Sequence, residues 1–247
     1  MKESQDRTVQ LEQLIIKEQV FCKKERTSES KDIYDPADMY EKFKVKAASM
    51  TDDGVYDIDE ENIEVIKMLT LYMCNHPDFE LMQKGTFLRS TPRLRAGILL
   101  IGNPGSGKSL IMKIFSSMKI PGNRINIINC DQITESYERQ GNYALDRFNS
   151  SYHINTRLAP YCFDDLGWEK KVAGHYSNKS NCMMEVIMKQ ERLYQDCHHK
   201  SHYTSNYSLT ELSAMYDIRT ESRLSAMCNV IVLGHKAESI DRRKKYQ

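Results

Sequence analysis

The clearest chemical pattern in the chain is a glycine-rich stretch at residues 102–109 (GNPGSGKS), directly after the apolar run 97–101. It fits GxxxxGK[S/T] without a mismatch, whereas a plain glycine-rich turn is the structural alternative. Glycines there let backbone N–H groups converge on a phosphate, and a helix that opens near Lys108 points its positive dipole end at the same anion. The pattern predicts an ATP phosphate site, with Lys108 on the β and γ oxygens and the Ser109 hydroxyl on Mg²⁺. The predicted nucleotide contacts here are Gly102, Asn103, Pro104, Gly105, Ser106, Gly107, Lys108, Ser109 and Leu110.

Polar side chains that could complete such a site follow two later apolar runs: Asp164 and Asp165 after the first, and Asn206 after the second. We assign Asp164 to the Mg²⁺ shell. Asp165 is expected to polarise the attacking water, because that role needs a carboxylate near the γ-phosphate but off the metal. Asn206 is expected to hydrogen-bond the γ-phosphate or to orient the water. The second acid favours hydrolysis over transfer to a small molecule, while an Asp-Asp turn and a helix cap are the structural alternatives.

Five apolar runs bounded by turn residues predict the elements that position these side chains. Helix-compatible segments separate the runs, which implies an α/β fold with a mainly parallel sheet covered on both faces. Ligands of open α/β sheets bind at the carboxyl ends of the strands, where the polar residues fall. The predicted strands are 97–101, 125–130, 159–163, 201–204 and 229–233.

The chain divides into two parts of different character. Residues 1–58 are expected to form a helical or linker segment, with a helix at 9–24 and a linker or loosely ordered stretch at 27–60. By its position alone, this segment would be a partner-binding adaptor. Residues 59–247 are expected to form the nucleotide-binding domain, because apolar periodicity tightens from Glu61 onward.

Composition narrows the class of protein. The 35 Lys plus Arg nearly balance the 34 Asp plus Glu, so the chain cannot hold polyanions by bulk charge and any nucleic-acid contact must be a local patch. No stretch approaches the roughly 18 apolar residues of a membrane span, and the beginning of the chain lacks the apolar core of a signal peptide. Seven cysteines, an odd number without a CxxC pair, favour a reducing compartment. We expect a soluble cytoplasmic protein without membrane contact.

Two weaker signals have plainer alternatives. Cys197, His198, His199 and His202 are of zinc-binding types, but no second cysteine pair completes a four-ligand set, so no structural zinc is expected. Residues 142–153 interleave aromatic and basic side chains, which suits single-stranded DNA. An amphipathic helix that packs through its rings explains the same pattern, yet this stretch is the best DNA-contact candidate.

From about Ala96 to Arg243 the chain resembles the AAA+ ATPases, and within them the DnaC-like helicase loaders and IstB-like transposition ATPases. The resemblance rests on residues 102–109, on 163–167 (FDDLG) with Glu169 after it, on 203–206 (YTSN) and on 218–224 (IRTESRL), in that order. It implies a three-layer P-loop fold with sheet order 5-1-4-3-2 and no C-terminal lid. It also implies self-association with ATP between adjacent subunits, and work on a replicative helicase or transposase bound to DNA.

Carried over residue by residue, the resemblance implies further roles. Lys108 and Ser109 look like the Walker A pair and Asp164 and Asp165 like the Walker B pair. Asn206 resembles sensor 1. Arg219 occupies the position that resembles the arginine finger, which completes a neighbouring subunit's site, and Arg223 competes for that role. For both arginines, a solvated helix face or an ion pair with Glu221 or Asp217 is the structural alternative. Arg242 or Arg243 is the candidate for sensor 2, with an ordinary basic tail as the alternative.

The resulting expectation is a slow Mg-ATP-dependent ATPase that loads a replicative helicase and is stimulated by assembly or single-stranded DNA. An IstB-like regulator on duplex DNA and a non-catalytic module that nucleotide merely stabilises are the alternatives. A small-molecule kinase is a further, weaker one, since no acceptor-binding lid follows the last apolar run.

Overall fold

The computed structural model describes residues 34–52, 54–148 and 160–234. The helix expected at 9–24 therefore lies outside the described residues. Within them, no helix is both long enough and apolar enough to span a membrane.

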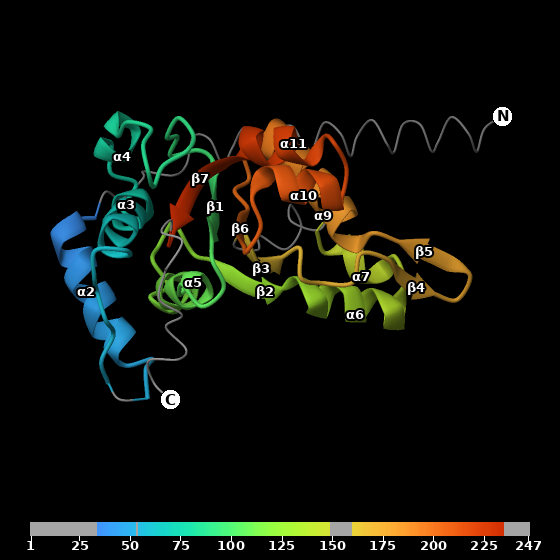
Figure 1. Cartoon of the computed structure of the whole chain (residues 1–247), viewed down its shortest axis with the longest axis horizontal. Helices are drawn as coiled ribbons and strands as arrows, with labels where there is room; N and C mark the ends of the chain where they lie inside the picture. The colour runs from blue at the N-terminus through green and yellow to red at the C-terminus, as the bar shows by residue number, and fades with distance from the viewer. Residues whose placement is uncertain (1–33, 53, 149–159, 235–247) are drawn as a thin grey trace, which may run out of the picture.

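A five-stranded parallel sheet forms the centre of the molecule (Figure 1). Its strands run in the order β2-β3-β6-β1-β7, and each overlaps one of the five predicted runs. Numbered along the chain without the separate hairpin, that order is 2-3-4-1-5, which read from the opposite edge is the expected 5-1-4-3-2. The strands are β1 (Gly97–Gly102), β2 (Asn126–Asn129), β3 (Tyr161–Leu166), β6 (His202–Ser205) and β7 (Cys228–Leu233). Strand β3 extends past its predicted end at residue 163, so that Asp164 and Asp165 lie inside the strand and not after it.

Helices cover both faces of this sheet, as the sequence predicts. On the central strand β1, Ile98 and Leu100 belong to one apolar core, and Leu99 and Ile101 belong to the other. This alternation is the two-residue period of a strand, and with helices on both faces it makes β1 apolar throughout. The first core is covered by α2 (Pro36–Ala48), α3 (Ile63–Met73), α4 (Asp78–Leu81) and α5 (Lys108–Ser117), and the second by α6 (Cys130–Gln140), α7 (Tyr143–Asp146), α9 (Cys182–Cys197), α10 (Leu209–Met215) and α11 (Thr220–Met227).

Helix α2 corrects the expectation of a linker at 27–60. The Asp35 side chain caps it and Pro36 opens it, which are both helix-start signals. Its Phe43 is fully buried, with its ring 4.8 Å from that of Phe115 on α5. The stripe of Met39, Phe43 and Ala47 was missed because single apolar residues four apart are a weak pattern in a polar sequence. The described part of residues 1–58 thus shares a core with the sheet, and a boundary at residue 58 stays a prediction.

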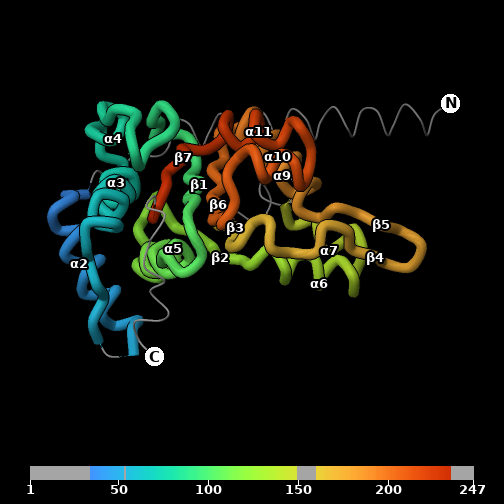
Figure 2. The backbone as a smooth tube through the Cα atoms, viewed as in Figure 1, coloured from blue at the N-terminus to red at the C-terminus, as the bar shows by residue number. Residues whose placement is uncertain are grey.

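An antiparallel hairpin, β4 (Ala173–His175) and β5 (Asn178–Ser180), was not anticipated. It follows β3 and packs on α6, where the His175 ring nitrogen Nδ1 lies 2.9 Å from the Glu138 carbonyl oxygen. The hairpin and α2 lie at opposite ends of the molecule (Figure 2). Its strands of three residues each, with a glycine and polar side chains, are too short to produce a periodic signal.

The buried His202 of β6 should make the fold acid-sensitive. Its Nδ1 accepts a hydrogen bond from the Ile98 N–H at 3.2 Å, and burial, helped by Lys200 and His199, lowers its pKa to about 3. Below about pH 6.5 the unfolded chain binds a proton that the folded chain refuses, so stability falls by about 1.4 kcal/mol per pH unit. Chemical denaturation of wild type and His202→Asn between pH 7.5 and 5 should show the steeper loss in wild type. Equal slopes would contradict this assignment.

Candidate functional site

The phosphate-binding loop connects the end of β1 to the start of α5, as the glycine pattern predicts. Gly105 and Gly107 take positive φ values of 77° and 96°, which side chains with a Cβ rarely adopt. At Gly102 a Cβ would lie 1.8 Å from the Leu233 carbonyl oxygen of the neighbouring strand β7. The loop therefore needs glycine at 102, 105 and 107 for its backbone path, and α5 begins at Lys108 with its amino end facing the loop.

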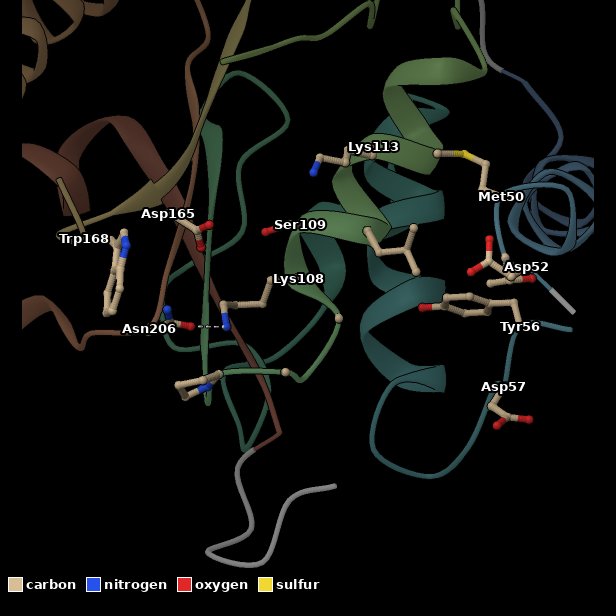
Figure 3. A pocket seen from close by; sticks show the side chains of 15 residues that line it. Met50, Asp52, Tyr56, Asp57, Lys108, Ser109, Lys113, Asp165, Trp168 and Asn206 are labelled. Atoms are coloured by element: carbon tan, nitrogen blue, oxygen red, sulfur yellow. Dashed lines mark hydrogen bonds between the residues drawn. The ribbon is translucent and has the colours of Figure 1, made fainter. Parts of the chain in front are cut away.

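Lys108 is the centre of this loop. Its side chain is 4% exposed, and Nζ donates to the carbonyl oxygens of Gly102 at 2.8 Å and Asn103 at 2.9 Å. Nζ also lies 3.4 Å from the Ser106 hydroxyl and donates to the Asn206 Oδ1 at 2.8 Å, the bond dashed in Figure 3. The predicted lysine and the predicted sensor asparagine, 98 positions apart in the chain, are thus in direct contact.

The two acids sit at an irregularity between β3 and β6. The register shifts between Phe163 and Leu166, which is the two-against-one count of a β-bulge. Asp165 has a positive φ of 59°, a conformation that aspartate tolerates better than most residues. The Thr204 hydroxyl accepts from the Asp165 N–H at 2.9 Å and donates to the Asp164 Oδ1 at 2.6 Å. The bulge and the Thr204 hydroxyl together place the Asp164 carboxylate in the interior and the Asp165 carboxylate at the pocket.

Asp164 and Asp165 differ in access. Asp164 is 4% exposed, with Oδ2 3.9 Å from the Lys113 Nζ, whereas Asp165 lines a pocket beside the phosphate loop. Figure 3 draws the Asp165 carboxylate and the Ser109 hydroxyl on facing sides of that pocket. Ser109 and these acids supply oxygen donors, the type that Mg²⁺ prefers, so the residues fit the metal. In the described chain, no cluster of three or more His, Cys, Asp or Glu residues forms a metal site of its own.

The pocket has a volume of about 1110 Å³ and joins the phosphate loop to parts of the chain that carry no recognisable motif. Of the predicted residues it brings together Pro104, Gly105, Gly107, Lys108, Ser109, Leu110, Asp165 and Asn206. Sequence reasoning missed Met50, Thr51, Asp52, Tyr56, Asp57, Lys113 and Trp168, which also line it. Met50, Asp52, Tyr56 and Asp57 come after α2 in the chain and lie on the side of α5 away from Asp165 (Figure 3). Of these residues, Trp168 carried a sequence signal, because it is the one tryptophan of the chain and directly follows residues 163–167. Its side chain is 72% exposed.

The two arginine candidates have different environments. Arg223 lies on α11 with 11% of its side chain exposed, and it pairs with Glu191 at 2.9 Å and Asp217 at 3.6 Å. Arg219 is exposed outside the pocket, and its backbone N–H donates to the Asp217 Oδ1 at 2.9 Å. Of the two, Arg219 is the side chain that another subunit could reach. Arg242 and Arg243, the sensor 2 candidates, lie outside the described residues.

The DNA-contact candidate at 142–153 is described up to residue 148. Leu145 and Phe148 are buried in the core, in agreement with the plainer alternative of a packing helix, while Tyr143 is 77% exposed. Of the zinc-type residues, His202 is buried in β6, whereas Cys197 and His198 end α9. Their side-chain bonds go to main-chain carbonyl oxygens of α9 one turn earlier, at Leu193 and Tyr194.

Comparison with known proteins gives structural matches alone: no protein-family model and no curated protein sequence matches the chain. DnaI is 14% identical, with a TM-score of 0.50 over 82% of this chain and 93% of that chain. The DnaC helicase loader is 16% identical, with a TM-score of 0.49 over 73% of this chain and 94% of that one. AMPPCP-bound DnaA from Aquifex aeolicus is 12% identical, with a TM-score of 0.47 over 77% of this chain and 51% of that one. The likeness to DnaI, the sheet order and the phosphate loop together show that the chain has the fold of the AAA+ P-loop ATPases.

Proposed function

We propose that the protein binds Mg-ATP and hydrolyses it as a AAA+ ATPase of DNA replication, acting as a loader of a replicative helicase. The observation that carries the ATPase part is the convergence of Lys108, Asp165 and Asn206 on one pocket, although they are far apart in the chain. The order of the four sequence blocks at 102–109, 163–169, 203–206 and 218–224 supports the loader part, because it resembles the DnaC-like family.

Each residue of the site would have its own role in binding or hydrolysing ATP. The Lys108 ammonium would exchange its bonds to the loop carbonyls for the β and γ oxygens of ATP. Asp165 would accept a proton from the attacking water, and Asn206 would orient that water or the γ-phosphate. Mg²⁺, when held by Ser109 and the Asp164 carboxylate, would neutralise charge on the β and γ oxygens.

Assembly would complete the site. The cations that line the pocket in the described chain are Lys108 and Lys113, while Arg219 is exposed elsewhere. A guanidinium supplied by a neighbouring subunit would stabilise the charge that develops on the γ-phosphate. Turnover per subunit would then depend on protein concentration.

The test of this function is the ATP hydrolysis rate across a range of protein concentrations, with and without single-stranded DNA. A rate per subunit that climbs with concentration, and again with single strands, is the expected result. Stimulation by duplex DNA in preference to single strands would instead favour the transposition regulator. ATP binding without turnover under every condition would leave a module that nucleotide merely stabilises.

Lys108→Ala should lower ATP affinity by about 100-fold, because it removes the charged donor to two phosphate oxygens. Isothermal titration calorimetry with a non-hydrolysable ATP analogue measures the loss. Lys67→Ala is the matched control, since Lys67 lies on the exposed side of α3 in an ion pair with Glu64. If Lys108→Ala binds the analogue as tightly as wild type and has a similar thermal unfolding midpoint, the phosphate loop does not bind ATP.

A further inference from the structure

A buried carboxylate joins two loops that sequence reasoning treated separately. Glu169 is 6% exposed and lies four residues after Asp165, in what we call the acidic turn, residues 164–169. Its Oε2 accepts from the Gly167 N–H at 2.9 Å, and its Oε1 accepts from the Tyr216 hydroxyl. One oxygen therefore holds the acidic turn itself, and the other holds a residue 47 positions away.

Burial makes this contact costly to break. Desolvation raises the pKa of Glu169, while the bonds from Tyr216 and Gly167 counteract part of that rise. Burial, together with the nearby Glu169, raises the pKa of Tyr216, so its phenol keeps the proton that it donates. A buried carboxyl group that loses one of its two donors keeps the cost of its desolvation without the bond that offsets it. The geometry of the two loops is therefore coupled through this bond.

Tyr216 directly precedes the exposed arginine. It ends α10, and residues 216–219, which we call the arginine turn, lead from it to the start of α11. Beyond Tyr216, the Asp217 carboxylate accepts from the Arg219 N–H and pairs with Arg223, which also pairs with Glu191. The arginine turn is thus fixed at one end to the acidic turn and at the other to α9 and α11. The backbone from which Arg219 projects is held, although its side chain is exposed.

We propose that Glu169 and Tyr216 are positioning residues: they tie the arginine turn of each subunit to its own acidic turn, so that Arg219 is presented in a fixed place to the ATP site of a second copy of this chain. This inference rests on the proposed function, because it assumes that Arg219 acts in a neighbouring site. Neither side chain lines the pocket, so neither is placed to contact ATP itself.

Tyr216→Phe is the mildest test, since it removes the hydroxyl and keeps the ring. We expect unchanged affinity for an ATP analogue and a drop of about tenfold or more in the hydrolysis rate at high protein concentration. Tyr176→Phe is the matched control, because Tyr176 is 96% exposed on the β4–β5 hairpin. A stimulated rate equal to wild type in Tyr216→Phe would overturn the proposal.

Subunit mixing separates positioning of the arginine from a general structural defect. The donor is Asp165→Asn, which is expected to bind ATP and to present an intact Arg219 without hydrolysing ATP itself. Added in excess, it should restore hydrolysis by Arg219→Ala subunits and equally by Tyr216→Phe subunits, because both retain a complete ATP site and lack only a correctly placed arginine next to it. A mixture of Arg219→Ala with Tyr216→Phe should stay slow.

The outcomes distinguish the positioning role of Tyr216 from the action of Arg219 in a neighbouring subunit. If Arg219→Ala is rescued and Tyr216→Phe is not, Tyr216 acts within its own site and the positioning role is wrong, while the proposed assembly stands. Mutual rescue of Arg219→Ala and Tyr216→Phe would also overturn it, since Arg219 would then work without the tyrosine hydroxyl. If the donor rescues neither variant, the arginine acting in a neighbouring site is itself wrong, and both proposals fall.

A double substitution tests whether Glu169 acts through Tyr216. If the two form one unit, Glu169→Ala combined with Tyr216→Phe should reduce the stimulated rate by no more than the larger single effect. Multiplied effects would mean independent actions and would overturn the pairing. Thermal unfolding of each variant identifies any that fail to fold. If Glu169→Ala fails to fold, Tyr216→Phe in the mixing experiment still tests the proposal.

Discussion

Arg219→Ala should bind ATP as tightly as wild type and lose about 10³-fold of its assembly-stimulated hydrolysis rate. The residue is exposed and lies outside its own pocket, so its removal leaves the phosphate loop and the acids untouched. What disappears is the guanidinium that would face the developing charge on the γ-phosphate in a neighbouring subunit. The measurement is the hydrolysis rate as a function of protein concentration, beside calorimetric binding of an ATP analogue.

Two further arginine variants make this result specific. Arg139→Ala removes an exposed arginine that pairs with Glu135 on α6, and it should retain the stimulated rate. Arg223→Ala breaks a largely buried contact with Glu191 and should lower the thermal unfolding midpoint. Arg219→Ala with full stimulated activity would show that the finger has been assigned to the wrong residue.

Asp165→Asn should bind ATP and hold it unhydrolysed, with a rate 10²- to 10⁴-fold below wild type. Asparagine adopts positive φ values as readily as aspartate, and its backbone N–H can still donate to the Thr204 hydroxyl. The substitution therefore preserves the bulge and removes the negative charge that would take the proton from water. Rapid quench after mixing with labelled ATP measures the chemical step directly.

The control for this substitution is Asp196→Asn, which changes an exposed carboxylate on α9 in the same way. It should hydrolyse ATP at the wild-type rate. If Asp165→Asn does so too while Asp164→Asn is inactive, the roles that we assign to the two acids are reversed. In that case the buried Asp164, and not Asp165, would take the proton from the attacking water.

The sequence alone determined the features that depend on neighbours in the chain. The continuous apolar runs predicted the strands, because a strand covered by helices on both faces of the sheet tends to be apolar on both sides. The glycines of residues 102–109 predicted the phosphate loop, because a backbone with positive φ at Gly105 and Gly107 has few alternatives. The polar residues near the carboxyl ends of the predicted strands indicated which end of the sheet carries the site.

Contacts between distant segments were decided by the tertiary structure. Helix α2 was missed because its few buried residues, Phe43 among them, form a recognisable apolar face only when Phe115 of α5 packs against them. Met50, Thr51, Asp52, Tyr56 and Asp57 line the pocket because the chain after α2 passes beside α5, and no motif in their own sequence predicts this position. Their place follows from core packing, which acts over the whole chain and leaves no periodic local signal.

The same reason explains the division between the two acids and between the two arginines. Asp164 and Asp165 are adjacent and chemically alike, and the bulge against β6 with the Thr204 hydroxyl gives one a buried position and the other the pocket. Arg219 directly precedes α11 and Arg223 lies within that helix, and of the two only Arg223 forms an ion pair with Glu191 of α9. The sequence thus determined which chemical groups are present and at which end of the sheet they gather. Hydrogen bonds and packing between distant segments decided which of these groups face solvent, which face the pocket and which contact one another.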